Sequence, residues 1–404
     1  MISAITISSK PPHDFLYVVY NQRKMPHGQH LPFAGNSAAH RTKTHHCMPQ
    51  TEAPDRILLI KLRHHGDILL TTPVARTLKS RYPRREIDML VYQETLPLLL
   101  NNPDISRVWT LDRKLHGWRK VLAQLALLRE LRKRRYRIVL HLSDQMQGAF
   151  FAKLLAREQA IGFDYPKRRK SPWRRFFTAL APLAPSNTLH TVSQNLLALQ
   201  PLGITPTESE RRCVLPVPEP SRNEVRALLR ERGVTGNYLV IHPASRWFFK
   251  CWEDDRFAQL ANTLADDGWH IVLTTAPDQN EMDMAASIMA LTHSDRIISL
   301  AGMLSLNQLA AVIDGARLFI GVDSVPMHMA AALNKDTVAL FGPSKIQEWH
   351  PWMTRYRLIS AADYGELIEP DQVDTATRQR YLANIPLAPV LDACRALLAE
   401  TRQE

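Results

Sequence analysis

The chain of 404 residues is 45% hydrophobic and 22% charged, with a formal net charge of +12. This length exceeds one ordinary hydrophobic core, so we expect two domains that fold without disulfides or a structural metal. The four cysteines are widely spaced and form no Cys-x-x-Cys pair, which argues against a disulfide framework or a zinc site and favours a reducing, cytoplasmic compartment. No apolar run approaches the length of a membrane span.

Residues 1–54 are predicted to be a disordered extension, because they hold six histidines, several prolines and no sustained hydrophobic periodicity. Their first residues lack a basic start and a sustained apolar core, so we expect no signal peptide. From residue 55 the pattern changes to alternating strands and helices. We predict strands at 56–62, 87–92, 107–111 and 137–142, and helices at 68–79, 96–100, 118–135, 145–155 and 191–199. This alternation predicts a Rossmann-like α/β domain over residues 55–210.

In the helix predicted at 118–135, one set of leucines traces an apolar stripe, which is typical of a helix face packed on a core. The set is Leu122, Leu125, Leu128 and Leu131. A proline-rich tract at 201–220 then closes the first domain. We therefore expect the tract to act as the linker to a second domain.

The second domain, predicted over residues 221–375, repeats the same alternation. Strands are predicted at 238–242, 270–275, 297–300, 317–320 and 338–341, and helices at 221–232, 254–267, 280–292 and 305–313. A C-terminal segment, residues 376–404, holds a last helix near 389–399 with one apolar side. The sequence thus predicts an α/β protein with two Rossmann-like halves.

Positive charge is concentrated in residues 113–175, which hold 18 Lys and Arg against four Asp and Glu, a balance of +14. Within this segment, residues 163–177 interleave aromatic residues with cations, a pattern that suits single-stranded nucleic acid, a membrane surface or a phosphosugar. The patch therefore favours a phosphate-bearing partner: nucleic acid, anionic lipid or a phosphorylated glycan. The alternative is a solvated helix face without a partner.

Residues 321–333 follow one predicted strand and precede the next, so they are expected to form a tight turn and a helix. Asp323 or Ser324 is the natural N-cap, and Pro326 lies in the first turn, where a proline is tolerated. A helix start exposes unpaired N–H groups and partial positive charge, so it suits a phosphate. His328 lies near enough to reach the same anion. The alternative is a plain βαβ unit with a well-capped helix.

Several familiar signatures are absent from the sequence: GxGxxG, GxxxxGK[ST], HExxH, GxSxG and Asp-x-Asp. A bound phosphate would therefore be held by protein cations and helix ends. After the strand at 238–242, Ser245 offers a hydroxyl and Lys250 a compact cation, although Lys250 also fits an ordinary surface lysine. Asp67 follows a glycine at the end of the first strand, where a carboxylate serves as a general base or as a helix cap.

Three stretches together resemble the lipopolysaccharide heptosyltransferases of glycosyltransferase family 9. They are Arg56-Ile-Leu-Leu-Ile-Lys-Leu-Arg-His-His-Gly-Asp-Ile-Leu-Leu-Thr-Thr-Pro-Val, Phe-Lys-Cys-Trp252 and Phe-Ile-Gly-Val-Asp-Ser-x-Pro-x-His-x-Ala-Ala-Ala. The Arg-His-His-Gly-Asp form and the Phe-Gly-Pro…Trp-His-Pro-Trp352 ending are most like the heptosyltransferase III subgroup. The resemblance runs from about residue 56 to residue 399.

This resemblance implies a GT-B fold, in which two Rossmann-like domains face each other across the site and the C-terminal helix packs back. It implies an inverting transfer of heptose from ADP-L-glycero-D-manno-heptose to the lipopolysaccharide inner core, with the second heptose as acceptor and no required metal or other cofactor. The implied partners are ADP-heptose, the inner-core acceptor and the anionic membrane surface. The implied location is the cytoplasmic face of the inner membrane, with no nucleic acid bound.

By the same resemblance, Asp67 is the general base that takes the proton of the acceptor hydroxyl. The residues expected to bind the donor are Ser245, Lys250, Glu281, Asp323, Ser324 and His328. The residues expected to bind the acceptor or its phosphates are Arg63, His64, Lys167, Arg168 and Arg169. Val325-Pro326 departs from the Gly-Leu of many members and removes one N–H donor, so the anion would depend more on side chains.

Three alternatives stay open at this point. The chain resembles other family members as well, so it fits a heptosyltransferase of type I or II that adds a different heptose. A protein that binds nucleic acid or an anionic glycan would explain the basic segment, although the sequence shows no helix-turn-helix or RNA-binding signature. A non-catalytic binder of core sugars is a third reading, which the presence of Asp67 disfavours.

Overall fold

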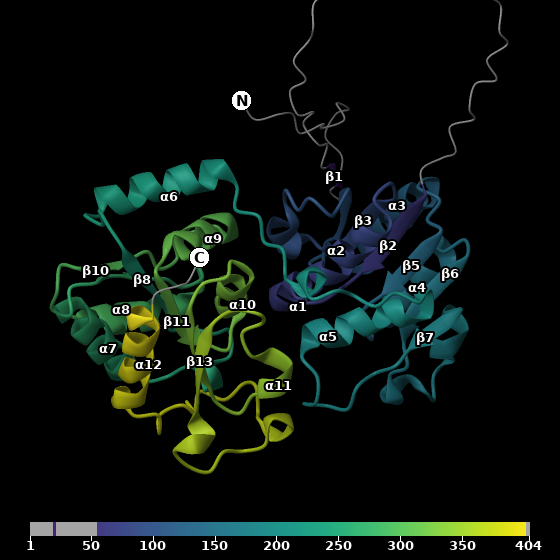
Figure 1. Ribbon diagram of the computed structural model, residues 1–404. Coiled ribbons are helices and arrows are strands. Elements are labelled where there is room, and N and C mark those ends of the chain that lie inside the picture. The colour runs from purple at the N-terminus through teal and green to yellow at the C-terminus, as the bar shows by residue number, and fades with distance from the viewer. Residues whose placement is uncertain (1–18, 22–54, 401–404) are drawn as a thin grey trace, which may run out of the picture.

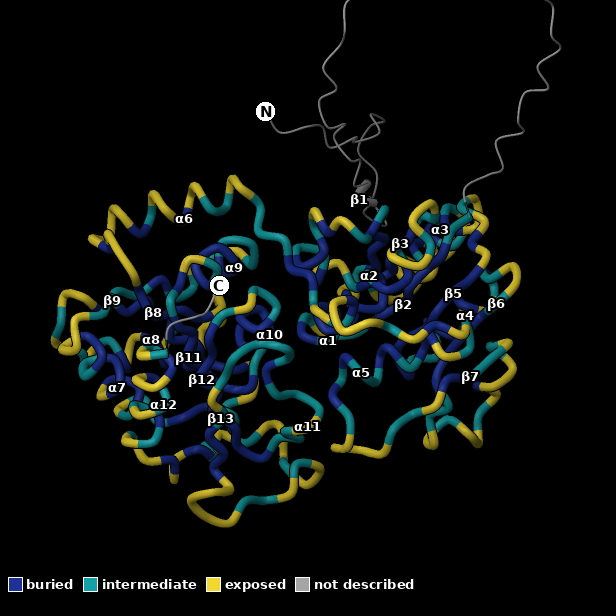
Figure 2. The backbone as a smooth tube through the Cα atoms, viewed as in Figure 1, coloured by how far each residue is buried: buried dark blue, intermediate teal, exposed yellow. Residues whose placement is uncertain are grey.

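The computed structural model describes residues 19–21 and 55–400, and these fold into two α/β domains that lie side by side (Figure 1). The first contains a seven-stranded sheet and the second a six-stranded sheet. The central strands of each sheet are largely buried (Figure 2). The predicted pair of Rossmann-like domains is confirmed.

The first sheet has the strand order β1-β4-β3-β2-β5-β6-β7. Its strands are β1 Val19–Asn21, β2 Arg56–Ile60, β3 Glu86–Tyr92, β4 Arg107–Leu111, β5 Ile138–His141, β6 Gln159–Phe163 and β7 Ala179–Ala181. Strands β2 to β7 pair in parallel. The sequence analysis did not predict β6 or β7, which follow the last strand predicted for this domain.

The predicted extension, residues 1–54, is described only at Val19–Asn21. These residues form β1, which pairs antiparallel with β4 at the edge of the first sheet. The sequence analysis did not predict this strand. The rest of the extension lies outside the described residues, so the prediction of disorder made for it is untested.

Helices cover both faces of the first sheet. One face packs against α1 His65–Leu69, α2 Thr72–Arg81 and α5 Thr191–Leu196. The other face packs against α3 Gly117–Lys133 and α4 Met146–Leu155. The helix predicted near 96–100 is a 3-10 helix, Gln93–Leu99. The side chains of β2 alternate between the two faces of the sheet. Ile57 and Leu59 face α1, α2 and α5, whereas Leu58 and Ile60 face α3 and α4.

The single helix predicted at 68–79 is wrong, because the chain forms α1 and α2 with a break between them. Pro73 has no N–H to donate to the carbonyl of Leu69, as a continuous helix would require. The hydroxyl of Thr72 donates to that carbonyl instead, at 2.7 Å. The break ends α1, the short helix that carries Asp67.

The apolar stripe predicted for the helix at 118–135 is also largely wrong. The residues of α3 that face the core are Ala123, Leu127 and Leu131. Leu122 and Leu125 lie on the opposite side and are 47% and 57% exposed. The sequence misled because α3 is apolar on two faces, and periodicity alone does not tell which face meets the sheet.

The second sheet has the order β10-β9-β8-β11-β12-β13, with all neighbours parallel. Its strands are β8 Tyr238–His242, β9 His270–Leu273, β10 Ile297–Ser299, β11 Leu318–Val322, β12 Thr337–Phe341 and β13 Tyr356–Ser360. Its helices are α6 Glu219–Glu231, α7 Asp254–Asp266, α8 Gln279–Ala290, α9 Leu306–Gly315, α10 Val325–Ala332, α11 Ile346–Trp349 and α12 Leu387–Ala399. Strand β13 was not predicted.

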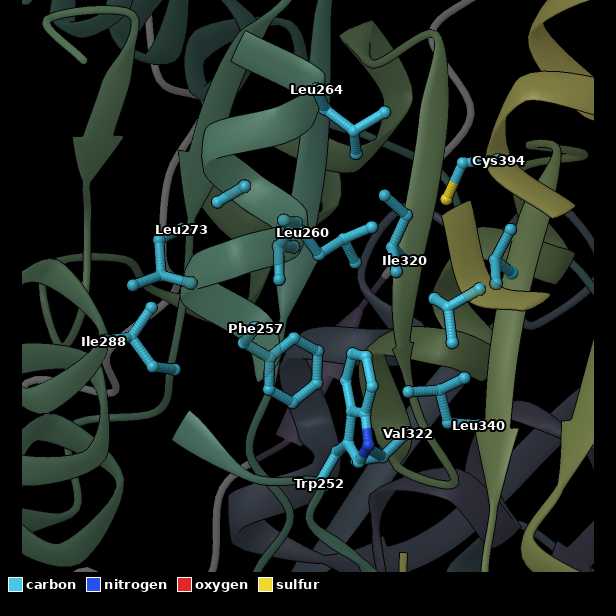
Figure 3. Close-up of a cluster of buried hydrophobic side chains, with 14 of the residues drawn as sticks. Trp252, Phe257, Leu260, Leu264, Leu273, Ile288, Ile320, Val322, Leu340 and Cys394 are labelled. Atoms are coloured by element: carbon cyan, nitrogen blue, oxygen red, sulfur yellow. The ribbon is translucent and has the colours of Figure 1, made fainter. Parts of the chain in front are cut away.

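The core of the second domain lies between its sheet and the helices α7, α8 and α12. Trp252, just after the loop that carries Lys250, is fully buried against Phe257 of α7, with ring centroids 5.2 Å apart (Figure 3). The indole N–H of Trp252 donates to the carbonyl of Ile385, 3.0 Å away. Cys394 of α12 packs into the same cluster, so the C-terminal helix closes this domain. These contacts fix the loop that follows β8. The exact domain bounds 55–210, 221–375 and 376–404 stay predictions.

The two domains meet along α1, which follows β2, and α10, which follows β11 (Figure 1). Leu69 and Leu98 of the first domain belong to the hydrophobic cluster of the second, together with α9 and α10. A second contact joins His190 to His350, whose carbonyl is 3.0 Å from the His190 Nε2 atom. The loops that follow β2 and β11 are therefore held against each other.

Candidate functional site

Both sheets share one topology, and it predicts where a ligand binds. In each, the order of six parallel strands reverses between the first and fourth, which are β2 and β5 in one domain and β8 and β11 in the other. A ligand in such a sheet binds outside the carboxyl ends of the strands at this switch point. The residues predicted from the sequence follow these strands: Asp67 follows β2, Lys250 follows β8, and Ser324 and His328 follow β11.

Helix α10 begins at the switch point of the second sheet with polar atoms that have no protein partner. Ser324 is the N-cap residue, in extended conformation with φ −155° and ψ 170°, but its side chain makes no capping bond. The Oγ atom of Ser324 and the Nδ1 atom of His328 are buried without a hydrogen-bond partner. Buried polar groups are nearly always paired, so these two atoms point to a ligand. With the helix N-terminus, they form a cradle suited to an anion.

His328 is neutral at physiological pH. Burial is the largest influence and lowers the pKa of His328 to about 4, although Asp323 opposes this shift. A neutral imidazole still donates one hydrogen bond, so His328 can contact a phosphate oxygen without adding a full charge.

Lys250 and Asp323 form an ion pair beside this cradle. The Nζ atom of Lys250 is 2.5 Å from the Oδ2 atom of Asp323, and the two side chains are 13% and 6% exposed. The Lys250 ammonium also lies 5.0 Å from the centre of the Trp247 ring. Asp323 therefore orients Lys250 and offsets its charge. An anion bound beside Asp323 would be repelled without this lysine.

Asp67 lies in the first turn of α1, whereas the N-cap position is His64, so the helix-cap alternative for Asp67 is wrong. The Asp67 side chain is 21% exposed. The preceding residue, Gly66, approaches the other domain closely, because a Cβ atom there would be 3.4 Å from Cδ2 of His328. Asp67 is therefore one residue from the point where the first domain touches the α10 cradle.

Lys61 is a candidate site residue that the sequence analysis missed. Its Nζ atom lies 3.9 Å from Oδ1 of Asp67 and donates to the Leu142 carbonyl at 2.8 Å and to Oδ1 of Asn195 at 3.0 Å. Burial is the largest influence and lowers the pKa of Lys61, although Asp67 opposes the shift. The signal in the sequence was a lysine inside an apolar strand, a position where lysine is rarely buried without a partner.

Asp144 is a second missed residue, and it gathers several of the predicted acceptor-binding cations. Arg63 donates to its Oδ1 atom at 2.9 Å, Lys167 pairs with its Oδ2 atom, and Arg168 donates to its carbonyl at 2.9 Å. Burial raises the pKa of Asp144, but Lys167 and Arg63 together lower it on balance. Asp144 follows β5, the partner of β2 at the switch point, so this cationic cluster borders the Asp67 loop.

The two other predicted acceptor-binding residues, Arg169 and His64, make no contact with Asp144 that joins them to this cluster. Arg169 pairs with Asp164 at 3.2 Å on the surface, outside the Asp144 cluster. His64 is exposed, and partial burial and then Arg246 of the second domain lower its pKa.

The two remaining donor-binding candidates follow neighbouring strands of the second sheet. Ser245, after β8, is buried, and its Oγ atom accepts from the Trp247 amide at 3.4 Å. Glu281 lies in the first turn of α8, and its Oε2 atom accepts from the Ala276 amide at 3.0 Å. Burial raises the pKa of Glu281. Both residues lie at the same edge of the sheet as Lys250.

The sequence analysis associated the aromatic residues of the stretch 163–177 with binding of single-stranded nucleic acid, a membrane surface or a phosphosugar. In the structure, they do not form an exposed stacking platform. Phe163 and Trp173 are buried, and the Trp173 indole donates to the Phe163 carbonyl at 2.8 Å. Trp173 also packs against Phe177, with centroids 5.0 Å apart. The cations of the stretch are left at the surface, so its binding capacity is electrostatic.

Residues 19–21 and 55–400, which the structure describes, lack two features. No cluster of three His, Cys, Asp or Glu side chains suits a metal ion there. In that part of the chain, no helix is long and apolar enough to cross a membrane.

Comparison with known proteins gives consistent relatives. A family model described as "Glycosyltransferase family 9 (heptosyltransferase)" matches residues 124–379. The chain is 37% identical over 338 residues to lipopolysaccharide heptosyltransferase 3 of Escherichia coli, covering 83% of this chain and 97% of that protein. It is 27% identical over 322 residues to lipopolysaccharide heptosyltransferase 2 of E. coli K12, covering 75% and 87% of the two chains.

Solved structures confirm the fold. A family 9 glycosyl transferase from Veillonella parvula superposes with a TM-score of 0.75 at 22% identity, covering 87% of this chain and 99% of that one. The E. coli heptosyltransferase WaaC with ADP gives a TM-score of 0.65 at 18% identity, covering 85% and 99%. The paired Rossmann-like domains of this chain therefore form a GT-B fold.

Proposed function

The chain belongs to glycosyltransferase family 9, the heptosyltransferases, and from this we propose that it transfers L-glycero-D-manno-heptose from ADP-heptose to the lipopolysaccharide inner core. We further propose that it adds a third heptose to the second. The observation that carries the proposal is the meeting of the Asp67 loop with the α10 cradle across the two domains. Transfer from a nucleotide sugar requires a general base close to a site that binds the leaving anion.

In the proposed reaction, the carboxylate of Asp67 accepts the proton of the acceptor hydroxyl as its oxygen attacks the anomeric carbon. Attack from the side opposite the leaving group inverts that centre. Lys61 places a positive charge 3.9 Å from Oδ1 of Asp67. The fixed bonds of Lys61 to Leu142 and Asn195 keep the cation in place. General base assistance of this kind is worth about 10²–10⁴-fold in rate.

The bond between the anomeric carbon and the ADP oxygen breaks with its electron pair on the diphosphate. We propose that Lys250, the amide groups at the start of α10 and the unpartnered atoms of Ser324 and His328 stabilise this charge. Ser245 and Glu281 would contact the rest of the nucleotide from neighbouring strand ends. Pro326 removes one amide donor, which gives the two side chains of α10 more weight.

The acceptor carries anionic groups, and the cations around Asp144 suit them. Arg63, Lys167 and Arg168 are already oriented by that carboxylate, so their positive charge faces the edge of the sheet that carries Asp67. We propose that this cluster binds the acceptor, that His64 lines the same entrance, and that Arg169 contributes only longer-range attraction.

The reaction as proposed needs no metal, because Lys250 and α10 supply the charge that a divalent cation would otherwise provide. We also propose that the enzyme works at the cytoplasmic face of the inner membrane, where a membrane-anchored acceptor would be presented to it. Unchanged turnover after treatment with EDTA is the expected result for metal independence.

The decisive experiment is incubation with ADP-heptose and a panel of truncated lipopolysaccharide acceptors, followed by mass spectrometry. We expect a mass gain of one heptose only on acceptors that already carry the second heptose. A gain on acceptors that lack heptose, or carry one, would assign the chain to a different step of the same pathway. No transfer to any acceptor, with ADP binding intact, would overturn the proposed function.

A further inference from the structure

Helix α3 presents apolar side chains on the face turned away from its sheet. Trp118, Val121, Leu122 and Leu125 are 67%, 56%, 47% and 57% exposed. Their spacing of i, i+3, i+4 and i+7 places them on one helical face. The opposite face, with Ala123, Leu127 and Leu131, packs on the sheet. The first two turns of α3 are therefore apolar on both sides, which an ordinary surface helix is not.

These are four of the nine large hydrophobic side chains that are exposed among the described residues. Phe150 of α4, the helix beside α3, is exposed as well. The other large hydrophobic side chains exposed in the described ranges lie on separate segments of the second domain: Trp247, Leu291, Met303 and Tyr364. Single exposed hydrophobic residues are ordinary, but a contiguous face is typical of an interaction surface.

The same helix carries a strong positive charge. Five of its cations are exposed: Arg119, Lys120, Arg129, Arg132 and Lys133. Its acidic residue, Glu130, is paired with Lys133 at 2.5 Å. Apolar side chains thus occupy the first half of the outer face, and cations flank them and fill the second half. This combination matches an anionic lipid surface, which offers both a headgroup layer and an acyl region.

The position of α3 relates this surface to the site. The helix starts at the carboxyl end of β4, at the edge of the sheet that also carries the Asp67 loop. Beside the start of α3 lies a cavity of about 160 Å³, lined by residues that include Tyr92, Arg113, Lys120 and Gln124. Arg113 pairs with Glu94, whose carbonyl lies 2.9 Å from the His65 ring. The apolar first half of α3 is thus nearer to Asp67 than its second half is.

We propose that α3 docks the enzyme on an anionic phospholipid bilayer. The exposed face of Trp118, Val121, Leu122 and Leu125 enters the interface with Phe150 beside it, and the flanking cations contact lipid phosphates. This docking turns the acceptor edge of the first domain toward the membrane. Its role in delivering the acceptor rests on the proposed function, whereas the lipid binding itself does not.

The test is a vesicle-binding assay on the full chain without substrates, with vesicles of phosphatidylglycerol and phosphatidylcholine. We expect Trp118→Ser/Leu122→Ser/Leu125→Ser to lower the partition coefficient by on the order of 100-fold at both low and high salt. We expect Arg129→Gln/Arg132→Gln/Lys133→Gln to lower it by roughly tenfold at low salt and little at high salt. The matched control, Leu291→Ser/Met303→Ser, removes exposed apolar residues from the second domain and should bind as the wild type does.

Circular dichroism confirms that each variant is folded. Wild-type partitioning by the α3 apolar variant, or equal binding to pure phosphatidylcholine, would overturn the proposal. So would a concentration-dependent dimer in sedimentation that the apolar variant abolishes, because the face would then join two copies of the chain.

Turnover assays distinguish a failure of the docking proposal from a failure of the proposed function. With a water-soluble, deacylated acceptor, the α3 apolar variant should keep wild-type turnover, and with vesicle-bound acceptor it should lose most of it. If neither the wild type nor any variant transfers heptose, but lipid binding follows the pattern above, the proposed function is wrong and the docking proposal is supported.

Discussion

Replacing Lys250 with methionine removes the cation that faces Asp323 and keeps most of the side-chain volume. We expect two separable effects, one on stability and one on donor binding. Two unit charges 2.5 Å apart attract by roughly 7 kcal/mol at an effective dielectric constant of about 20, before desolvation is subtracted. Removing one partner of such a buried pair leaves the other charge unpaired and costs about 3–5 kcal/mol. Lys250→Met should therefore lower the free energy of unfolding by about this amount.

The double variant Lys250→Met/Asp323→Asn separates the two effects. It removes the stranded carboxylate as well, so urea unfolding should show that most of the lost stability returns. Calorimetry with ADP should still show an affinity lowered by roughly 10–100-fold in both variants, because neither has the cation for the diphosphate. Wild-type ADP affinity in the double variant would refute the assignment of Lys250 to the diphosphate. Equal stability of the single and double variants would refute the buried ion pair.

The remaining predictions concern the base, the domain contact and acid stability. Asp67→Asn should lower kcat by about 10²–10⁴-fold and leave ADP binding unchanged in calorimetry; near-normal ADP release would refute its role as base. Gly66→Val should lower kcat/KM by roughly tenfold or more, because its side chain would meet His328; Gly66→Ala, whose Cβ just fits, is the control. Stability should fall between pH 7 and pH 5, because burial lowers the pKa of four histidines below the value of about 6.5 that they have when unfolded. Their folded pKa values are about 4 or 3, so the unfolded chain binds more protons than the folded chain in this range. Each of these histidines therefore lowers the free energy of unfolding by about 2 kcal/mol at pH 5. An unchanged urea midpoint between pH 7 and pH 5 would contradict this prediction. The four histidines are His141, His190, His242 and His328.

The regular parts of the fold were predictable because each domain repeats one pattern of buried strand and amphipathic helix. The errors arose where a single residue or a tertiary contact determines the local structure. Pro73 divides a helix that periodicity joins, and α3 is apolar on two faces, so only the packed structure shows which leucines are buried. β1 depends on pairing with β4 across a long separation in sequence, which no local pattern encodes.

The site residues divide in the same way. Asp67, Lys250, Ser324 and His328 stand in motifs, and the sequence alone pointed to them. Their neighbours Lys61 and Asp144 act through contacts with distant residues: Lys61 with Asn195, and Asp144 with Lys167. Such pairs are brought together by the sheet order, so they emerge only when the strands are placed.

The apolar contact of Leu69 and Leu98 with α9 and α10 has a thermodynamic consequence. Because side chains of the first domain complete a core of the second, neither domain can unfold without exposing part of the other. The chain should then melt in one cooperative transition, although its length suits two. A nucleotide held by the second domain would also raise the melting temperature of the first, including strands that it never touches.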